Sequence, residues 1–150
     1  MWIWPRRDNG NIAKSNRRIK SIKKKLASQA NKTYRITSYY TGDSTGSGAT
    51  TASGLQTKDF QVNEKGWYTY QGKIVIATAN RSLLKYGWPE VDGITYYKLY
   101  DTFTLVINGV PYDAIVLDSC GACMKKNIID VFVMDREHMV GGTAKIIKGK

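Results

Sequence analysis

The chain holds few of the residues on which several common chemistries depend: among its 150 residues are one histidine, two cysteines and three prolines. No serine lies in a nucleophile-elbow pattern, so a Ser-His-Asp hydrolase built on His138 is disfavoured. Cys120 and Cys123 supply only half of a zinc site, and no βαβ context marks them as a redox motif. A local disulfide outside the cell, or simply small loop residues, are the interpretations that stay open.

Long apolar runs are also missing, since no segment approaches the ~20 residues that cross a membrane. At the start of the chain, Met1–Pro5 precede the first arginines, which is the reverse of a secretory signal. We therefore expect no membrane span and no export signal. A protein of this kind that works outside the cell or in the cell wall would need release at lysis, a holin-type route, or carriage on a virion.

Acidic residues are scarce in the first part of the chain. Residues 1–35 contain 11 Lys or Arg and one acid, whereas residues 36–150 contain 12 Lys or Arg and 11 acids. Apolar residues spaced at helical intervals predict a basic helix over 15–30, and we expect the arm 14–32 to bind an anionic wall polymer or another protein. The nearly neutral remainder disfavours nucleic acid as a partner. Two domains are predicted: a basic arm over 1–33 and a folded domain over 34–150.

Strand and turn signals dominate the folded domain. Asn108-Gly109 has the composition of a two-residue hairpin turn. Helical turns are predicted near 82–86 and over 135–140, the latter capped by Asp135. Strands are predicted at 34–41, within 66–79, and at 95–100, 103–107, 110–117, 128–134 and 143–147, with a loop at 42–54. Many short strands and few helices predict a mainly β, small closed barrel.

Two carboxylates stand out against apolar strands. Asp118 follows the run Ala114–Leu117, and Asp130 interrupts a second apolar strand. On a half-buried strand Asp130 could simply face water. If it faces a groove with apolar walls, desolvation raises its pKa and makes it a usable proton donor.

The segment from Asp118 to Asp130 resembles the signature of the 3D domain, which is named for three aspartates. That family is related to the MltA-type lytic transglycosylases and more distantly to RlpA and expansins. The match includes Asp118, Gly121, Ala122, Asn127 and Asp130, with a loop one residue longer than the family pattern.

Flanking segments extend the resemblance over about residues 35–148. Residues 37–42 and 48–54 resemble the family's opening motifs, and residues 137–142 resemble a later one. One departure is clear, because Thr78 stands where the family has its earliest aspartate. The connection over 80–100 is also longer than usual.

The resemblance implies a six-stranded double-psi β-barrel and a lytic transglycosylase that cuts the MurNAc-GlcNAc strands of peptidoglycan without metal or cofactor. Asp130 matches the general acid/base and Asp118 a supporting carboxylate. A phage tail or virion component is the setting we expect. The residues expected to bind substrate are Thr37, Tyr39, Thr51, Ser53, Gly121, Lys125 and Asn127.

Other functions are also compatible with these residues. Asp118 and Asp130 could form the carboxylate pair of a glycoside hydrolase. A non-catalytic wall-binding or structural barrel of a phage tail, similar to expansins, is the second hypothesis, and Thr78 supports it. Four aromatic residues could stack on sugars or belong to the core: Tyr39, Tyr40, Trp67 and Trp88.

Overall fold

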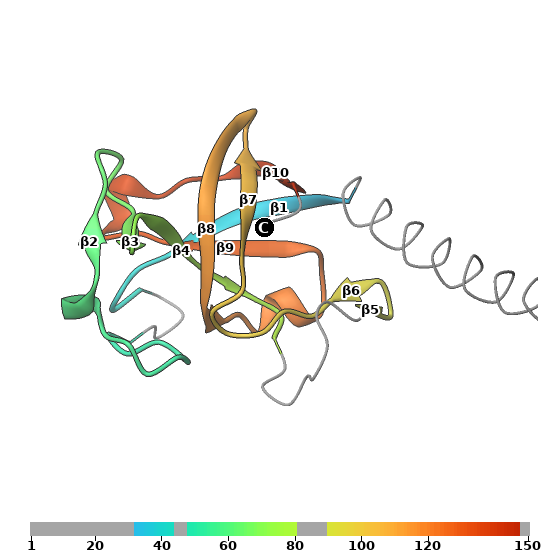
Figure 1. Ribbon diagram of the computed structural model, residues 1–150, viewed down its shortest axis with the longest axis horizontal. Helices are drawn as coiled ribbons and strands as arrows, with labels where there is room; N and C mark the ends of the chain where they lie inside the picture. Colours follow the sequence, from blue (N-terminus) through green and yellow to red (C-terminus); the bar gives the residue numbers. More distant parts are fainter. Residues whose placement is uncertain (1–31, 44–47, 81–89, 148–150) are drawn as a thin grey trace, which may run out of the picture. The chain divides into compact units, whose positions relative to one another are not determined.

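The computed structural model describes residues 32–43, 48–80 and 90–147 (Figure 1). The chain divides into two units, 1–32 and 33–150, and the second is the one described below. The predicted basic helix over 15–30 and the helical turn near 82–86 lie outside the described residues. Within them the only helices are three short 3₁₀ turns. No helix among the described residues is long and apolar enough to cross a membrane.

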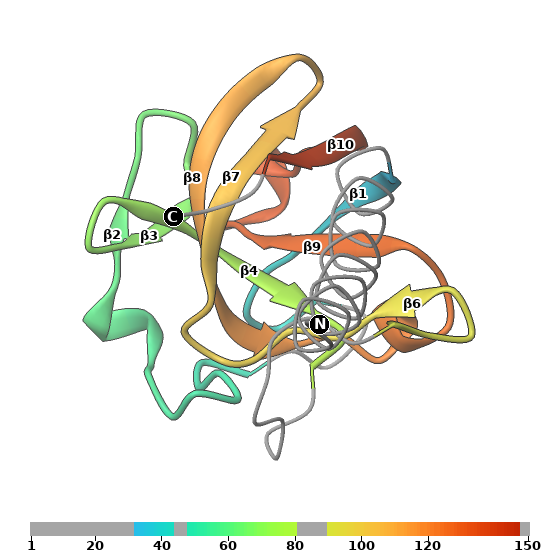
Figure 2. The same cartoon turned by 45° about the vertical axis from the view of Figure 1, so that its right-hand side comes forward.

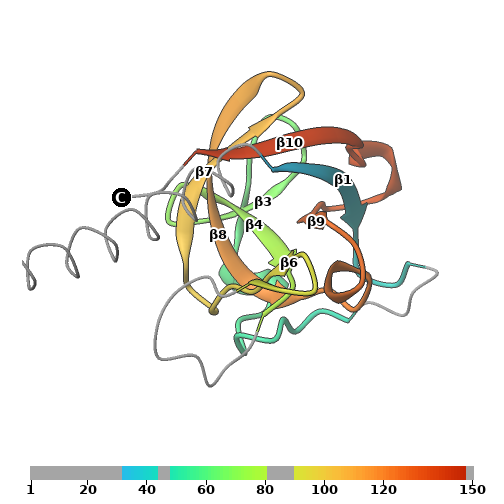
Figure 3. The same ribbon diagram turned by 90° about the vertical axis from the view of Figure 1, so that its right-hand side faces the viewer.

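Six strands close into a mixed barrel, which confirms the predicted mainly β barrel. Around the barrel the order is β4-β8-β7-β10-β1-β9, and β9 pairs with β4 to complete the ring (Figure 3). The pairs β1–β9 and β4–β8 are parallel, and the other four are antiparallel. The strands are β1 (Thr33–Tyr39), β4 (Lys73–Thr78), β7 (Thr102–Ile107), β8 (Val110–Ser119), β9 (Ile128–Phe132) and β10 (Gly142–Ile147).

Shorter strands and turns decorate the barrel. β2 (Gln61–Val62) and β3 (Tyr68–Tyr70) extend the sheet outward from β4 (Figure 2). β5 (Glu90–Val91) pairs with β6 (Ile94–Thr95) in a separate two-stranded sheet. The 3₁₀ turns are Thr57–Asp59, Ala122–Met124 and Arg136–His138. The last of these confirms the turn predicted after Asp135, whose side chain accepts hydrogen bonds from two backbone N–H groups of that turn.

Strands β4 and β9 and the middle of β8, residues 114–117, are buried on both faces. Alternate residues, such as Ile76 and Val116, belong to an interior cluster to which all six barrel strands contribute. The residues between them face outward into a second cluster that includes Ala77, Leu117 and Phe132. Burial on both sides explains why these segments are mostly apolar instead of alternating, with Asp130 as the exception in β9.

Several predicted strand limits were wrong. Strand β1 ends at Tyr39 and β9 at Phe132, each two residues before the predicted end. The strand expected over 95–100 ends at Thr95, because the chain then makes only an isolated bridge at Tyr97 and turns through Tyr100, whose φ is +74°. A non-glycine residue at positive φ cannot continue a strand. Strand β8 also continues past Leu117 to Ser119, so Asp118 lies in the strand and not after it. A register shift between β4 and β8 at this point sets Asp118 opposite Ala77, and its side chain lines the cavity described below.

The Asn108-Gly109 turn joins β7 and β8, as predicted, with φ of +50° and +85°. Its asparagine also has a tertiary role. The Asn108 side chain donates to the carbonyl of Gly141 at 2.8 Å and accepts from the N–H of Thr143 at 3.2 Å. The turn thus holds the start of β10 against the β7–β8 hairpin.

Asn108→Ala should lower the free energy of unfolding by about 1–2 kcal/mol, because two hydrogen bonds and a residue suited to positive φ are lost together. Chemical denaturation measures the change. Gln71→Ala is the matched control, since Gln71 occupies a similar turn at φ +52°. An equal loss in both variants would contradict the proposed role of the asparagine side chain.

Candidate functional site

A cavity of about 500 Å³ lies beside the predicted carboxylates. The strands β1, β4, β8 and β9 contribute to it, together with the segments before and after them. Its lining consists of Tyr39, Gly48, Thr50, Ala77, Asp118, Ser119, Cys120, Gly121, Ala122 and Asp130. The volume is in the range of small-ligand sites. Both predicted carboxylates therefore face one cavity.

Asp130 points outward from the middle of β9, between neighbours that face the barrel interior. The hydroxyl of Thr37, its partner across the β1–β9 ladder, donates to its Oδ1 at 2.9 Å. Burial raises the pKa of Asp130 from 3.8 to about 6, against the opposing effect of the Thr37 hydrogen bond. The charges of Asp43 and Asp118 add smaller upward shifts. A carboxyl group with this pKa can hold a proton in mildly acidic solution and release it near neutrality.

Asp118 has a more polar environment. Its Oδ1 accepts from the backbone N–H groups of Ala52 and Ser119, both at 2.9 Å. Its Oδ2 accepts from the hydroxyl of Tyr39 at 3.0 Å. An ionised carboxylate offers about four acceptor positions, of which protein donors here occupy three. The arrangement favours a carboxylate that is held in place.

Ala77 separates the two carboxylates. In the sheet it is aligned with Asp118 on one side and with Asp130 on the other. Two strand spacings place the backbones of the aspartates ~10 Å apart. The residue of β4 that lines the cavity is Ala77, whereas its neighbour Thr78 is buried and does not. No side chain of β4 therefore brings a third carboxylate into the cavity.

Tyr39 crosses from β1 toward Asp118. Its ring stacks on Phe132, with centroids 4.5 Å apart and planes 4° from parallel, and belongs to the same outer cluster as Ala77. Burial raises the pKa of the Tyr39 hydroxyl well above its usual value, and the Asp118 charge raises it further. The phenol therefore stays protonated and acts as a donor to Asp118.

The loop over residues 48–55 forms another wall of the cavity, to which Gly48 and Thr50 contribute. Ser53 donates its N–H to the carbonyl of Leu117 at 3.0 Å, which docks the loop on β8. Within the loop, the hydroxyls of Thr51 and Ser53 are 2.7 Å apart, and Thr51 also donates to the carbonyl of Leu55. These contacts aim the N–H of Ala52 at Asp118.

The predicted substrate-binding residues have different positions in the structure. Tyr39 and Gly121 line the cavity, and Thr37 contacts Asp130 directly. Thr51 and Ser53 serve the adjoining loop, as described above. Lys125 is exposed and Asn127 is half-buried, and neither lines the cavity. Their roles in binding stay predictions.

Sequence reasoning missed a polar pair that supports Asp118. Asn80 donates from Nδ2 to the Asp118 carbonyl at 3.0 Å and accepts from the hydroxyl of Ser119 at 2.8 Å. These contacts join the end of β4 to the end of β8. Asn80 lies outside the family motif, and Ser119 lies within it but is not one of the matched residues. The signal that could have found them is the polar ending of two apolar strands.

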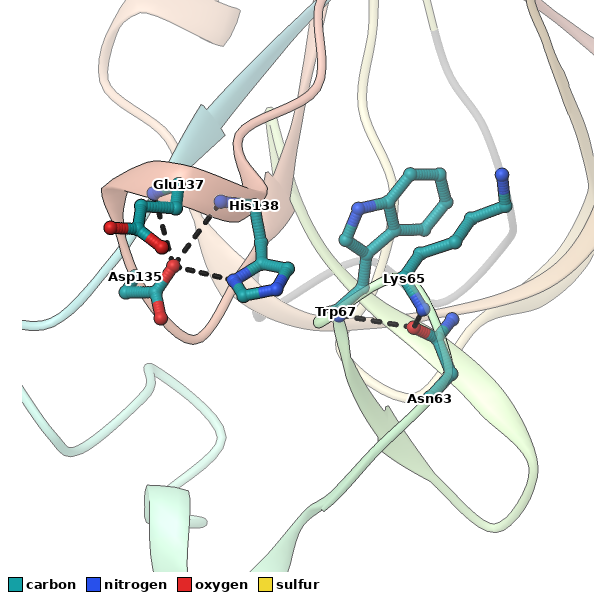
Figure 4. Close-up of polar contacts among 6 residues, drawn as sticks. All are labelled: Asn63, Lys65, Trp67, Asp135, Glu137 and His138. Atoms are coloured by element: carbon teal, nitrogen blue, oxygen red, sulfur yellow. Dashed lines mark hydrogen bonds and ion pairs between the residues drawn. The ribbon is translucent and has the colours of Figure 1, made fainter.

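Figure 4 shows the surroundings of Trp67 and His138. Trp67 packs in the interior cluster beside Tyr112, which supports the core interpretation of this aromatic residue. The His138 ring nitrogen Nδ1 lies 2.5 Å from Asp135 Oδ1 (Figure 4). Tyr40 packs partly buried against the interior cluster, and Trp88 lies outside the described residues. Neither Trp67 nor His138 lines the cavity.

Cys120 and Cys123 form a disulfide, which removes both as zinc ligands. Among the described residues no group of three or more His, Cys, Asp or Glu side chains could hold a metal ion. Of the interpretations left open by the sequence, the structure contains the local disulfide.

Comparisons with family models, with curated proteins and with solved structures find no match for this chain. The case for a function therefore depends on the site itself.

Because the pKa of Asp130 is raised in the folded protein, the free energy of unfolding should depend on pH. A carboxyl whose pKa is higher in the folded state favours folding while it is protonated, and this contribution is lost as the pH rises through about 6. Asp130→Asn should therefore raise the free energy of unfolding at pH 8 by about 1–3 kcal/mol relative to wild type, and the gain should vanish near pH 3.5. Urea denaturation at the two pH values measures it.

Asp113→Asn is the matched control, because Asp113 is exposed on β8. It should give no comparable gain at pH 8. If Asp130→Asn is equally neutral at both pH values, the desolvation of Asp130 is refuted.

Proposed function

We propose that this protein is a peptidoglycan lytic transglycosylase and that Asp130 is its general acid and base. The observation that carries the proposal is the unequal pair of aspartates in one cavity. Asp130 is desolvated with a pKa of about 6, and Asp118 is held by three donors. Two carboxyl groups in one site commonly have different chemical roles when one is desolvated and the other is held by hydrogen bonds.

In the proposed reaction, protonated Asp130 donates its proton to the glycosidic oxygen as the bond to the anomeric carbon breaks. The leaving sugar departs as an alcohol, and positive charge develops on the remaining ring. Its own 6-hydroxyl attacks the anomeric carbon, and the Asp130 carboxylate takes the hydroxyl proton. The product is a 1,6-anhydro sugar, no water is consumed, and Asp130 ends protonated as it began.

Asp118 supports this step in two ways. Its negative charge stabilises the positive charge that develops on the sugar ring. Its three donors hold the carboxylate in place and leave about one acceptor position for a water molecule or a sugar hydroxyl, so product analysis separates transglycosylation from hydrolysis. The positions of Thr37 and Tyr39 fit this scheme, since each orients one carboxylate.

The observed barrel is consistent with the same proposal. A closed barrel of six strands with two parallel pairs agrees with the double-psi topology that the 3D-domain resemblance implies. The double-psi topology and the relation to the 3D-domain family are therefore part of the same proposal as the activity. The phage-tail setting and the basic arm's polymer or protein partner belong to the same hypothesis.

A second function is favoured by one observation. Ala77 occupies the cavity wall between the aspartates, so β4 brings no carboxylate to the site. A barrel that binds glycan strands without cutting them would also fit such a cavity. Product analysis separates the two functions.

Purified peptidoglycan should be digested with wild type, Asp130→Asn and Asp118→Asn, and the products analysed by mass spectrometry. We expect anhydro-muropeptides from wild type, a loss of at least about a hundredfold in Asp130→Asn, and a smaller loss in Asp118→Asn. Asp113→Asn, on the same strand as Asp118, should retain wild-type activity. Reducing ends in place of anhydro ends would indicate a hydrolase. Glycan binding without products from wild type would favour the non-catalytic function.

A further inference from the structure

The Cys120–Cys123 disulfide forms part of the cavity wall. It begins two residues after Asp118, and Cys120 lines the cavity together with Gly121 and Ala122. The N–H of Cys120 donates to the carbonyl of Thr78 at 3.1 Å, so the bridge is anchored to the end of β4. The disulfide therefore constrains the chain segment that follows Asp118.

The two sulfur atoms have different surroundings. Cys120 is half-buried at the cavity, whereas Cys123 is 2% exposed and packs with Ala79, Ile94 and Ile128. The cavity therefore gives an external thiolate a route to Cys120, whereas Cys123 is covered. Thiol–disulfide exchange depends on such access to the attacked sulfur.

Cys123 also lies against the strand between the aspartates. Its sulfur is 3.8 Å from the carbonyl oxygen of Ala77, the residue aligned with both Asp118 and Asp130. In the disulfide this sulfur carries no hydrogen, so the contact is van der Waals packing. After reduction, the thiol can donate to that carbonyl as a weak hydrogen bond. A change of redox state thus acts next to the carboxylate pair.

We propose that Cys120–Cys123 is a thiol–disulfide exchange site that a dithiol opens through Cys120, and that its opening loosens the cavity wall beside Asp118. The effect on glycan cleavage rests on the proposed function. The exchange and the loosening do not.

The exchange is a balanced two-electron step. A thiolate of the dithiol attacks Cys120 Sγ, the Cys120–Cys123 bond breaks, and Cys123 leaves as a thiolate that takes a proton from water. The second thiolate of the dithiol then attacks the dithiol's other sulfur, the one bonded to Cys120 in the mixed disulfide. The Cys120 thiolate is released and is protonated in turn. The protein disulfide is reduced to two thiols, and the dithiol is oxidised to a cyclic disulfide.

A monothiol should be a poor reductant of this bridge. Once it has formed a mixed disulfide at Cys120, Cys123 is only three residues away and attacks back as an intramolecular nucleophile. Removing Cys123 prevents that return and traps the adduct. The two cysteines can therefore be distinguished one at a time.

The first test measures which sulfur is reachable. Cys123→Ser and Cys120→Ser are incubated with glutathione disulfide, and adduct formation is followed by intact mass. The Cys120 thiol should react at least about tenfold faster than the Cys123 thiol, because only the former lines the cavity. Equal rates, or faster reaction at Cys123, would overturn the assignment of Cys120 as the entry point.

The second test measures the wall. Wild type is treated with dithiothreitol, and amide hydrogen exchange is compared with that of the oxidised protein. Exchange should rise at residues 119–124 and stay unchanged in the β7–β8 hairpin at 104–113. The Cys120→Ser/Cys123→Ser variant should match reduced wild type without any reductant. Unchanged exchange at 119–124 would overturn the proposal.

Activity is a separate arm of this experiment. If wild type releases anhydro-muropeptides, reduction should lower the rate several-fold, and an unchanged rate would overturn the link between redox state and cleavage. If wild type releases no products, the proposed function fails, and the mass and exchange measurements still decide whether the bridge is a thiol-accessible part of the wall.

Discussion

The pairing of β4 with β9 is the constraint on which the site depends. This pair closes the barrel, and it sets Ala77 beside Asp130, while the parallel β4–β8 ladder sets the same residue beside Asp118. Two aspartates from strands that are not neighbours thereby face one cavity across a single small side chain. In an open sheet β9 would lack this second neighbour, and the distance between the carboxylates would not be fixed.

The fold also gives the two carboxylates different surroundings. Asp130 projects from a strand buried on both faces, so its charge is desolvated and its main compensation is one hydroxyl, that of Thr37. Asp118 lies near the end of β8, where a loop, its own strand and Tyr39 can all supply donors. In the proposed function, these different surroundings give one aspartate the proton-donating role and the other the charge-stabilising role.

Much of the barrel was predictable because local patterns determine it. Apolar runs located β4, β8 and β9, and the Asn108-Gly109 signal located the hairpin within one residue. The predicted pair Asp118 and Asp130 does face a common cavity. Local patterns could not predict the long-range contacts. Ala52, Tyr39 and Asn80 reach Asp118 from distant parts of the chain. The strand register decides that Ala77 and not Thr78 lines the cavity.

The protonation of Asp130 is the most direct test of this account. A carbon-13 NMR titration that resolves the Asp130 carboxyl should give a midpoint of about 6, because burial on β9 raises its pKa. In Asp118→Asn the midpoint should move slightly downward, since the Asp118 charge contributes to the shift. A midpoint near the ordinary value of 3.8 in wild type would mean that the carboxyl is fully hydrated, and would contradict its assignment as the proton donor of the site.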